Sequence, residues 1–471
     1  MKSASRLLAA ALLTGLAFRL VLLLIPTAPL ATKVLEPTGD SPEYVRLATN
    51  LVHGHGFSQD SVPPFRPDIL RTPVYPLFLA LPLIVHRPSF VVVAVALQIL
   101  LSLAVLWLTY RLGIELGLTP ETAALASFLS ALSPNLAFYS VKLTTEMLFL
   151  PLLLVTLLLI NRFRILHRRQ ELFAAGICSG LLILTRPIAI FFPVVLAAYV
   201  FWLARRSPFT AHRPSLVVPL VFLACVSIVV APWVIRNRRV AGRYTISTVF
   251  DYDIYEYSGA LTLAAARLIP VEDARDSLAA EAEHRFGPLD ENDQVAYWSA
   301  MARVGRQQMF ARPLLAAKVH VVGSAGGLMQ PVGIRPLLVF SGVDPTAGDA
   351  GTPGVAQKTL QLVARGRVGQ ALALAWKERV ARIPGLALVI LAYAVLFHTA
   401  LLVIGAVGLF LRRSRGLLWL LLPILYFVVT AGPVSEVRFR VPIEPLLCIF
   451  AAVALTRQPR TSNVGASAPA T

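Results

Sequence analysis

Long runs of apolar side chains, separated by short polar stretches, dominate the hydrophobic pattern of this chain. About twenty consecutive apolar residues cross the hydrocarbon core of a bilayer as one α-helix. At this length the pattern predicts about ten transmembrane helices, at residues 7–25, 90–110, 123–138, 147–160, 172–184, 188–204, 216–234, 385–411, 417–431 and 443–455. We therefore predict an all-α polytopic membrane protein.

The polar segments divide the chain into four parts. Residues 1–234 are predicted to form an N-terminal membrane domain, whose first outer loop, 26–89, contains amphipathic interfacial helices. A larger outer loop between the seventh and eighth spans occupies residues 235–384. Residues 385–456 supply the C-terminal transmembrane helices. The Ser-, Ala- and Pro-rich residues 457–471 are predicted to be a disordered cytoplasmic tail.

Composition excludes several classes of protein. Hydrophobic residues make up 56% of the 471 positions and charged residues only 14%, whereas soluble domains carry about 25% charged residues. An ordinary soluble domain, a disordered chain and a fibrous protein are thus excluded. The three cysteines all lie in apolar runs and have neither disulfide-framework nor metal-ligand spacing.

The net charge of +18 is explained by topology rather than by nucleic-acid binding. If the N-terminus is cytoplasmic, every short arginine cluster between spans falls on the cytoplasmic side, as the positive-inside rule requires. These clusters lie near residues 111, 162–169, 205–213, 412–415 and 457–460. We expect a multi-pass protein of the inner (plasma) membrane with both termini cytoplasmic and two long extracytoplasmic loops.

The first outer loop places two carboxylates at the start of a predicted surface helix. Asp40 directly precedes Ser41-Pro42, which suits a helix N-terminus, and Glu43 follows one turn later. Both carboxylates can therefore face the same volume. Paired carboxylates suit general-base work on an attacking hydroxyl or binding of a divalent cation. The alternative is that Asp40 caps the helix and Glu43 complements its dipole.

The same loop contains further candidates for binding. His53 and His55 flank Gly54 and are weak candidates for a metal site together with Asp40, with solvated turn residues as the alternative. Arg71 precedes an apolar stretch too short to span the membrane. Its guanidinium would lie at the depth of lipid phosphate. There it would either bind a phosphate bidentately or simply anchor this segment at the membrane interface.

Charged residues at the outer ends of other predicted spans are functional candidates, because isolated charges there are costly. Glu146 opens one span, and Lys142 is its expected ion-pair partner. Arg186 has no nearby carboxylate in the sequence, which favours an anionic ligand. The remaining outer arginines that could meet a phosphate are Arg236, Arg438 and Arg440, of which the last two would project to one side if the chain is extended.

The larger outer loop contains one segment rich in acids and aromatic rings. Residues 250–259 read Phe-Asp-Tyr-Asp-Ile-Tyr-Glu-Tyr-Ser-Gly, the composition expected where sugar faces stack on rings and hydroxyls meet carboxylates. A strand with a polar face is the alternative. The candidates for acceptor or sugar contacts are Tyr44, Glu146, Asp251 and Asp253. Further along, residues 307–330 favour an interfacial amphipathic helix, with an additional pair of spans as the alternative.

Taken together, these segments resemble the multi-span glycosyltransferases of the C superfamily, and most of all the bacterial protein-mannosyltransferase-like and lipid A aminoarabinose-transferase-like enzymes. The matching segments are Gly39-Asp40-Ser41-Pro42-Glu43-Tyr44, His55-Gly56-Phe57, Arg71-Thr72-Pro73-Val74-Tyr75-Pro76, Ser133-Pro134, Glu146, Thr185-Arg186-Pro187, Pro232-Trp233, Arg236-Asn237 and Arg438-Phe439-Arg440-Val441-Pro442. The chain departs from the family at Phe439, where relatives often have tyrosine, and at residues 251–257, which have no clear counterpart.

The resemblance implies that a sugar moves from a polyprenyl-phosphate donor to a hydroxyl of a lipid, glycan or protein acceptor on the extracytoplasmic face, by inverting displacement. It assigns Asp40 as base or metal contact, with Glu43 beside it. It also implies that Arg71, Arg186, Arg236 and Arg438 hold the lipid-linked phosphate. The cofactor stays open, with a divalent cation as one option, and nucleic acid is not an expected partner. The alternatives are an O-antigen ligase- or polymerase-like enzyme and a lipid-linked sugar transporter.

Overall fold

The computed structural model describes most of the chain, namely residues 2–25, 29–35, 39–206, 216–331, 337, 367–375, 385–411, 415–434 and 436–456. Within these ranges the regular secondary structure is helical and no residue forms a strand. The predicted all-α class is therefore confirmed. The predicted tail at 457–471 and the portions 332–336, 338–366 and 376–384 of the larger outer loop lie outside the described residues.

Each of the apolar runs forms helix in the structure. The corresponding helices are α1 (Lys2–Leu24), α5 (Phe90–Glu115), α6 (Pro120–Leu132) with α7 (Pro134–Val141), α8 (Glu146–Leu166), α9 (Arg169–Thr185), α10 (Phe192–Arg206), α11 (Val217–Ala241), α20 (Gly385–Leu411), α22 (Leu421–Ala431) and α23 (Glu444–Leu455).

These helices differ in length, and only some of them are long enough to form a full span. Seven helical segments of the described chain are long and apolar enough to cross a membrane, two of which extend α10 and α22 by the short helical turns beside them (Pro187–Arg205 and Gly416–Val434). The pair α6 and α7, bent by 58°, adds an eighth if it is one span. The two others are shorter, since α9 has 17 residues and α23 has 12. The multi-pass character is thus supported, and the number of about ten spans stays a prediction.

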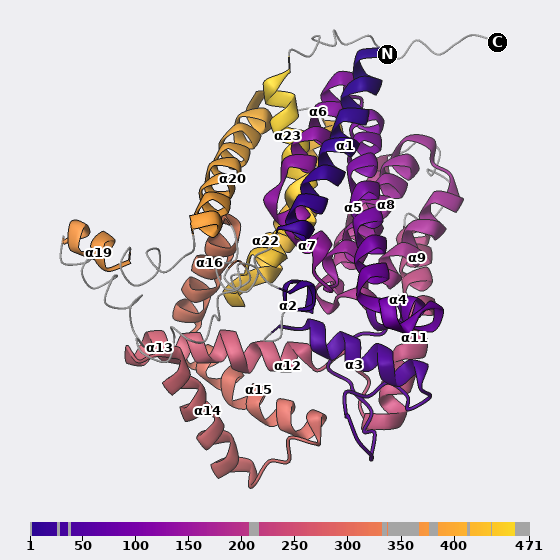
Figure 1. The fold of residues 1–471 in the computed structure, drawn as a ribbon. Helices are drawn as coiled ribbons and strands as arrows, with labels where there is room; N and C mark the ends of the chain where they lie inside the picture. The colour runs from indigo at the N-terminus through magenta and orange to yellow at the C-terminus, as the bar shows by residue number, and fades with distance from the viewer. Residues whose placement is uncertain are drawn as a thin grey trace.

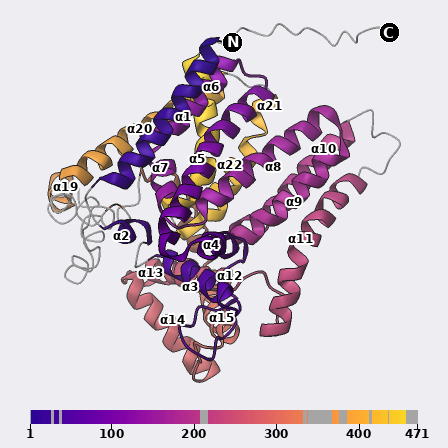
Figure 2. The same cartoon turned by 45° about the vertical axis from the view of Figure 1, so that its right-hand side comes forward.

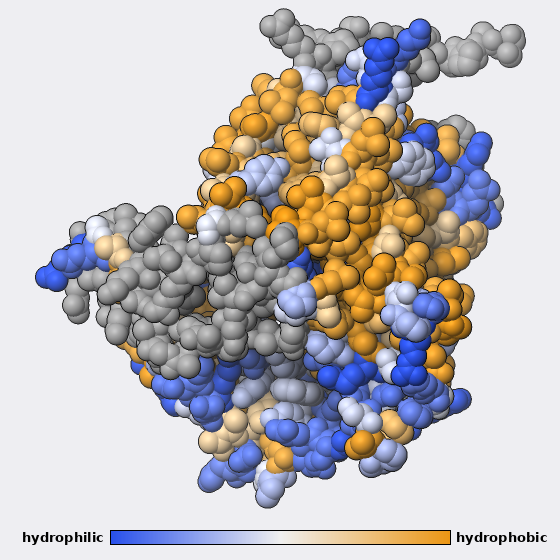
Figure 3. Space-filling view, in the orientation of Figure 1, coloured by the Kyte–Doolittle hydropathy of each residue, from blue (hydrophilic) through white to orange (hydrophobic). Residues whose placement is uncertain are grey.

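The apolar helices stand together as one bundle with a polar layer at one end. In Figures 1 and 2 the bundle rises from α3 and α12–α15 toward the end where α1 begins. Figure 3 shows apolar side chains over the bundle and hydrophilic ones over the layer at its foot. This division is expected when the bundle contacts lipid and the layer contacts water.

The polar layer is built largely by the chain that follows α11. Its elements are α12 (Val249–Asp253), the π-helical turn η4 (Ile254–Gly259), α13 (Ala260–Arg267), α14 (Val271–Phe286) and α15 (Gln294–Ala311). These elements share a small core of their own, which includes Tyr255, Leu263, Leu278 and Met301. The alternative of a polar-faced strand at 251–257 is therefore wrong, because this segment is helical.

Residues 307–330 belong to two helices rather than one. The helix α15 ends before Arg312, and α16 (Pro313–Met329) starts with a proline, which cannot continue the preceding helix. The second helix packs against α22 and the 3₁₀ turn η7 (Gly432–Val434). There Gly323 is so close that an added Cβ would lie 2.5 Å from the Gly432 carbonyl oxygen.

Two helices of the first outer loop complete the layer. They are α3 (Ser41–Val52) and α4 (Val74–Val85), which pack against each other. The buried face of α3 includes Tyr44, Leu47 and Ala48, whereas Val52 is 36% exposed. The short elements that connect the others are α2 (Leu30–Leu35), η1 (Arg87–Ser89), η2 (Pro187–Ala189), α19 (Val368–Ala375), α21 (Arg415–Leu418), η8 (Val437–Phe439) and η9 (Val441–Ile443).

Candidate functional site

Asp40 joins two arginines that come from distant parts of the chain. One of its oxygens accepts a hydrogen bond from Arg71 Nη2 (2.7 Å) and the other from Arg438 Nη1 (2.6 Å). Asp40 occupies the N-cap position of α3, yet its side chain makes no capping hydrogen bond. The simple capping alternative therefore does not describe this carboxylate, which instead fixes two guanidinium groups beside each other.

Glu43 also faces Arg71, as the spacing of the two carboxylates predicts. Arg71 Nε donates to Glu43 Oε2 at 2.6 Å, and its guanidinium lies 5.3 Å from the centre of the Tyr44 ring. The Arg71 side chain is only 13% exposed. The N-cap and the first turn of α3 thus supply two carboxylates and a ring that together hold the arginine in a single orientation.

The backbone around Arg71 is anchored from several sides. Thr248 N donates to the Ile69 carbonyl at 3.0 Å, and Thr72 Oγ1 donates to the Thr185 carbonyl at 3.1 Å. The Arg71 amide donates to Asp68 Oδ1 at 2.9 Å. Sequence reasoning missed Asp68, which is almost completely buried. Its burial depends on tertiary packing, which the sequence alone does not show.

Glu146 forms an ion pair with Arg186, a partner that the sequence analysis did not give it. Arg186 Nη1 donates to Glu146 Oε1, and both side chains are buried, with 6% and 1% exposure. The Arg186 guanidinium also lies 5.2 Å from the centre of the Phe439 ring. Tertiary packing of α8 on α9 brings together two charges that the sequence separates by forty residues.

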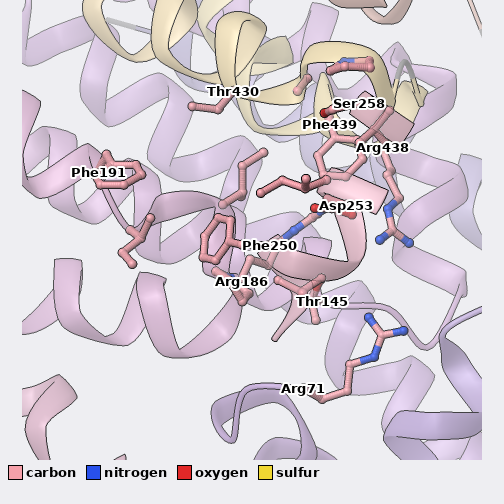
Figure 4. A pocket seen from close by; sticks show the side chains of 18 of the residues that line it. Arg71, Thr145, Arg186, Phe191, Phe250, Asp253, Ser258, Thr430, Arg438 and Phe439 are labelled. Carbon is pink, nitrogen blue, oxygen red and sulfur yellow. The ribbon is translucent and has the colours of Figure 1, made fainter. Parts of the chain in front are cut away.

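Three arginines line one cavity of about 310 Å³. They are Arg71, Arg186 and Arg438, and each retains at least one guanidinium nitrogen that makes no hydrogen bond or ion pair within the described residues. The opposite part of the wall is apolar and includes Ile188 and Phe191. In Figure 4, Phe191 and Thr430 lie on one side of the cavity and Arg438 and Arg71 on the other.

A second cavity, of about 360 Å³, adjoins the first. Asp40, Glu43 and Glu436 line it together with the rings of Tyr252, Tyr257 and Trp298. The two cavities share several wall residues, namely Arg71, Val249, Asp253, Val434, Arg438 and Phe439. Trp298, on α15, was not among the sequence-based candidates, since the aromatic pattern of residues 250–257 gives no indication of its partner from another helix.

The remaining predicted arginines lie elsewhere. Arg440 forms a buried ion pair with Glu444 (3.2 Å), in which both side chains are 1% exposed. Arg236 donates to the Asp68 carbonyl at 2.6 Å and lies 4.7 Å from the centre of the Trp233 ring. Neither arginine lines the two cavities.

The two aspartates of residues 250–257 lie in different surroundings. Asp251 forms ion pairs with Arg243 (2.8 Å) and with Arg306 of α15 (3.1 Å). Asp253, two residues later, lines both cavities. The two carboxylates therefore differ in their surroundings, although the sequence presents them as equivalent.

The site shifts the pKa values of its acids in opposite directions. Burial alone would raise the pKa of Asp40, but Arg438 and Arg71 outweigh burial and hold that pKa well below its usual range. Burial raises the pKa of Asp253 to about 7, against the opposing effect of Arg438 and Arg71. Asp40 is thus an anion throughout the physiological range, whereas Asp253 exchanges a proton near neutral pH.

The candidate metal ligands do not converge on one point. No group of three histidine, cysteine, aspartate or glutamate side chains with metal-binding geometry occurs in the described part of the chain. The His55 ring stacks on Phe65 with centroids 4.0 Å apart, and His53 Nε2 lies 3.0 Å from Arg87. Because both Asp40 oxygens face guanidinium nitrogens, this arrangement does not fit a cation.

Comparison with known families supports the resemblance found in the sequence. Residues 70–233 match the model of the dolichyl-phosphate-mannose-protein mannosyltransferase family. This segment includes Arg71, Glu146 and Arg186 but not Asp40 or Arg438. No curated protein matches the chain.

Several solved structures are similar to the chain at low identity. The oligosaccharyltransferase of Archaeoglobus fulgidus in its apo form has 16% identity and a TM-score of 0.49, over 96% of this chain and 50% of that chain. Its complex with an inhibitory peptide and a dolichol-phosphate has 18% identity and a TM-score of 0.48, over 95% and 50%. The chain thus spans about half the length of this enzyme, which is also known in complex with zinc and sulfate.

A third similar structure is that of ArnT from Cupriavidus metallidurans bound to undecaprenyl phosphate. It has 14% identity and a TM-score of 0.36, over 96% of this chain and 77% of that chain.

Proposed function

We propose that this protein is an integral membrane glycosyltransferase that moves a sugar from a polyprenyl-phosphate donor to a hydroxyl acceptor. The acceptor is a lipid, a glycan or a protein, and the reaction is a single displacement with inversion. One observation carries the proposal: Arg71, Arg186 and Arg438 line the same cavity, and each keeps guanidinium N–H groups that bind no other group in the part of the chain that the structure describes.

This cavity suits the phosphate of a lipid better than that of a soluble nucleotide. Guanidinium groups present several N–H donors in a fixed plane, which matches phosphate oxygens. The apolar wall includes Phe191, which is 62% exposed on the bundle surface. A polyprenyl chain could therefore enter from the bilayer along this wall while its phosphate meets the arginines.

The same arginines would assist the chemical step. When the bond between the anomeric carbon and the phosphate oxygen breaks, negative charge develops on the departing polyprenyl phosphate. Donors that are already oriented stabilise such charge without reorganisation. Asp40 and Glu43 supply that orientation, because Asp40 forms ion pairs with both Arg71 and Arg438 and Glu43 forms one with Arg71. The match of residues 70–233 to a mannosyltransferase family supports sugar transfer as the reaction.

The site is proposed to face the extracytoplasmic side of the inner (plasma) membrane. The short arginine clusters include residues 162–169 and 205–206, at the ends of α8, α9 and α10. These ends lie away from α3 and α12, which border the cavities (Figure 2). The positive-inside rule puts the clusters in the cytoplasm, so α3 and α12 would lie outside.

Binding of undecaprenyl phosphate to the purified protein in detergent tests this function. Replacing Arg71 or Arg438 with alanine removes charge-assisted hydrogen bonds worth about 1.5–3 kcal/mol each, so we expect affinity to fall roughly ten- to hundredfold. Arg285→Ala is the matched control, since this arginine lies on α14 with 42% exposure and does not line either cavity. Unchanged affinity in the Arg71 and Arg438 variants would refute the proposed donor site.

A further inference from the structure

Asp253 occupies a position that no other carboxylate in the site shares. It is the last residue of α12, directly before the π-helical turn, and it lines both the cavity with the three arginines and the cavity with the aromatic rings. Figure 4 shows it beside Phe250, Phe439 and Arg438 in the wall of the first cavity. A group at this position can reach a molecule that extends from one cavity into the other.

The Asp253 carboxylate is also not engaged by another side chain of the described residues. Within the described residues it makes no hydrogen bond and no ion pair. The other carboxylates of the two cavities are engaged, because Asp40 and Glu43 pair with Arg71 and Glu436 lies 3.2 Å from Arg438. An acid without a partner, in a cavity wall, is available to exchange a proton with a bound molecule.

The backbone that carries Asp253 is fixed in place. Asp251, two residues earlier in α12, forms ion pairs with Arg243 and Arg306. After Asp253 the π-helical turn packs so closely on α15 that a Cβ on Gly259 would lie 2.5 Å from the Gly305 Cα. Contacts on both sides of the residue therefore position its side chain, as a group that takes part in a reaction requires.

We propose that Asp253 is the proton acceptor of the transfer reaction. This assignment rests on the proposed function and replaces the sequence-based expectation that Asp40 is the base. The acceptor hydroxyl enters from the aromatic cavity, and its oxygen forms a bond to the anomeric carbon of the donor. The bond from that carbon to the phosphate oxygen breaks, and its electron pair leaves with the polyprenyl phosphate. The proton of the hydroxyl passes to the Asp253 carboxylate and then to water.

The charges around both acids explain why Asp253 and not Asp40 takes this role. Asp40 is held between two guanidinium groups that keep its pKa low, so it is a weak base. Burial raises the pKa of Asp253 to about 7, which is near the optimum for proton transfer at neutral pH. The charged and titratable groups that line the two cavities with Asp253 are Asp40, Glu43, Tyr44, Arg71, Arg186, Tyr252, Tyr257, His320, Glu436 and Arg438.

Asp253→Asn tests the assignment in the full-length protein. The substrates are undecaprenyl phosphate linked to radiolabelled hexoses and a membrane extract that supplies acceptors. Removing a general base lowers the rate by about 10²–10⁴-fold, so we expect kcat to fall at least a hundredfold. Binding of undecaprenyl phosphate should stay unchanged and shows that the variant is folded. Glu256→Gln is the matched control, since Glu256 pairs with Arg275 (3.0 Å), does not line either cavity and should leave kcat unchanged.

Two further measurements separate a proton acceptor from a structural residue. Formate should restore part of the rate in Asp253→Ala, since it can enter the vacated space and accept the proton. In the unmodified protein kcat/KM should rise as the pH increases through about 7, because only the deprotonated carboxylate accepts a proton. With Asp40 as the base the profile would be flat in this range.

The results distinguish this assignment from the proposed function itself. If the unmodified protein transfers sugar and Asp253→Asn does so at a similar rate, Asp253 is not the proton acceptor, although the function stands. A pH profile that is flat around neutrality has the same meaning. If the unmodified protein neither binds undecaprenyl phosphate nor releases sugar from it, the proposed function fails first.

Discussion

At the scale of single residues, Arg438 and Arg440 show why spacing alone misassigns a role. An extended chain would project both to one side. The structure instead places Arg438 in the 3₁₀ turn η8 and Arg440 between η8 and η9, so the chain is not extended here. About three residues complete a 3₁₀ turn, and positions two apart therefore face different directions. Arg438 therefore lines the cavities, whereas Arg440 enters the core and meets Glu444.

The role of Arg440 is thus expected to be structural. Glu444 accepts a hydrogen bond from Asn135 (2.7 Å), and Arg440 donates to the Leu328 and Pro331 carbonyls, each at 3.1 Å. Arg440→Ala would leave the Glu444 charge buried without its partner, which costs about 3–5 kcal/mol. We expect the thermal unfolding midpoint to fall clearly, while the folded protein binds undecaprenyl phosphate as before. A variant of normal stability that no longer binds it would place Arg440 in the donor site.

The sequence predicts which charged residues belong to the site, but not which of them form ion pairs with each other. The residue types of the site were predictable, since Asp40, Glu43, Arg71, Arg186 and Arg438 all line the cavities. Their partners were not predictable. The Asp40–Arg438 pair joins residues 398 positions apart, and the Arg186–Glu146 pair joins residues 40 apart. Only tertiary packing determines such contacts, and an isolated sequence contains no spacing rule for them.

At the scale of elements, the sequence predicts helices well and their interruptions poorly. Apolar runs are local features, so each of the predicted runs is helical in the structure. The bend of 58° after Leu132 and the break at Arg312 depend on prolines, which limit helix continuation but do not determine the direction of the next helix. The π-helical turn after Asp253 has no sequence signal that we can identify.

At the scale of the whole molecule, the account requires a fixed orientation in the membrane. Ser61 is exposed in the first outer loop, and Gln170 is exposed at the start of α9. In a variant without the native cysteines, we expect a membrane-impermeant maleimide to label Ser61→Cys in intact cells. It should label Gln170→Cys only after the cells are opened. The reverse pattern would place the cavities on the cytoplasmic side.

Release of sugar from a polyprenyl-phosphate donor is the most direct test of the central claim. The purified protein is incubated with undecaprenyl phosphate linked to radiolabelled hexoses and with a membrane extract as the source of acceptors. We predict that label leaves the lipid and appears in an acceptor, and that Arg438→Ala slows this transfer roughly a hundredfold or more. Arg285→Ala should transfer at the normal rate. A protein that binds the donor or moves it across a bilayer, but releases no sugar from any of these lipids, would contradict the account and favour a transporter.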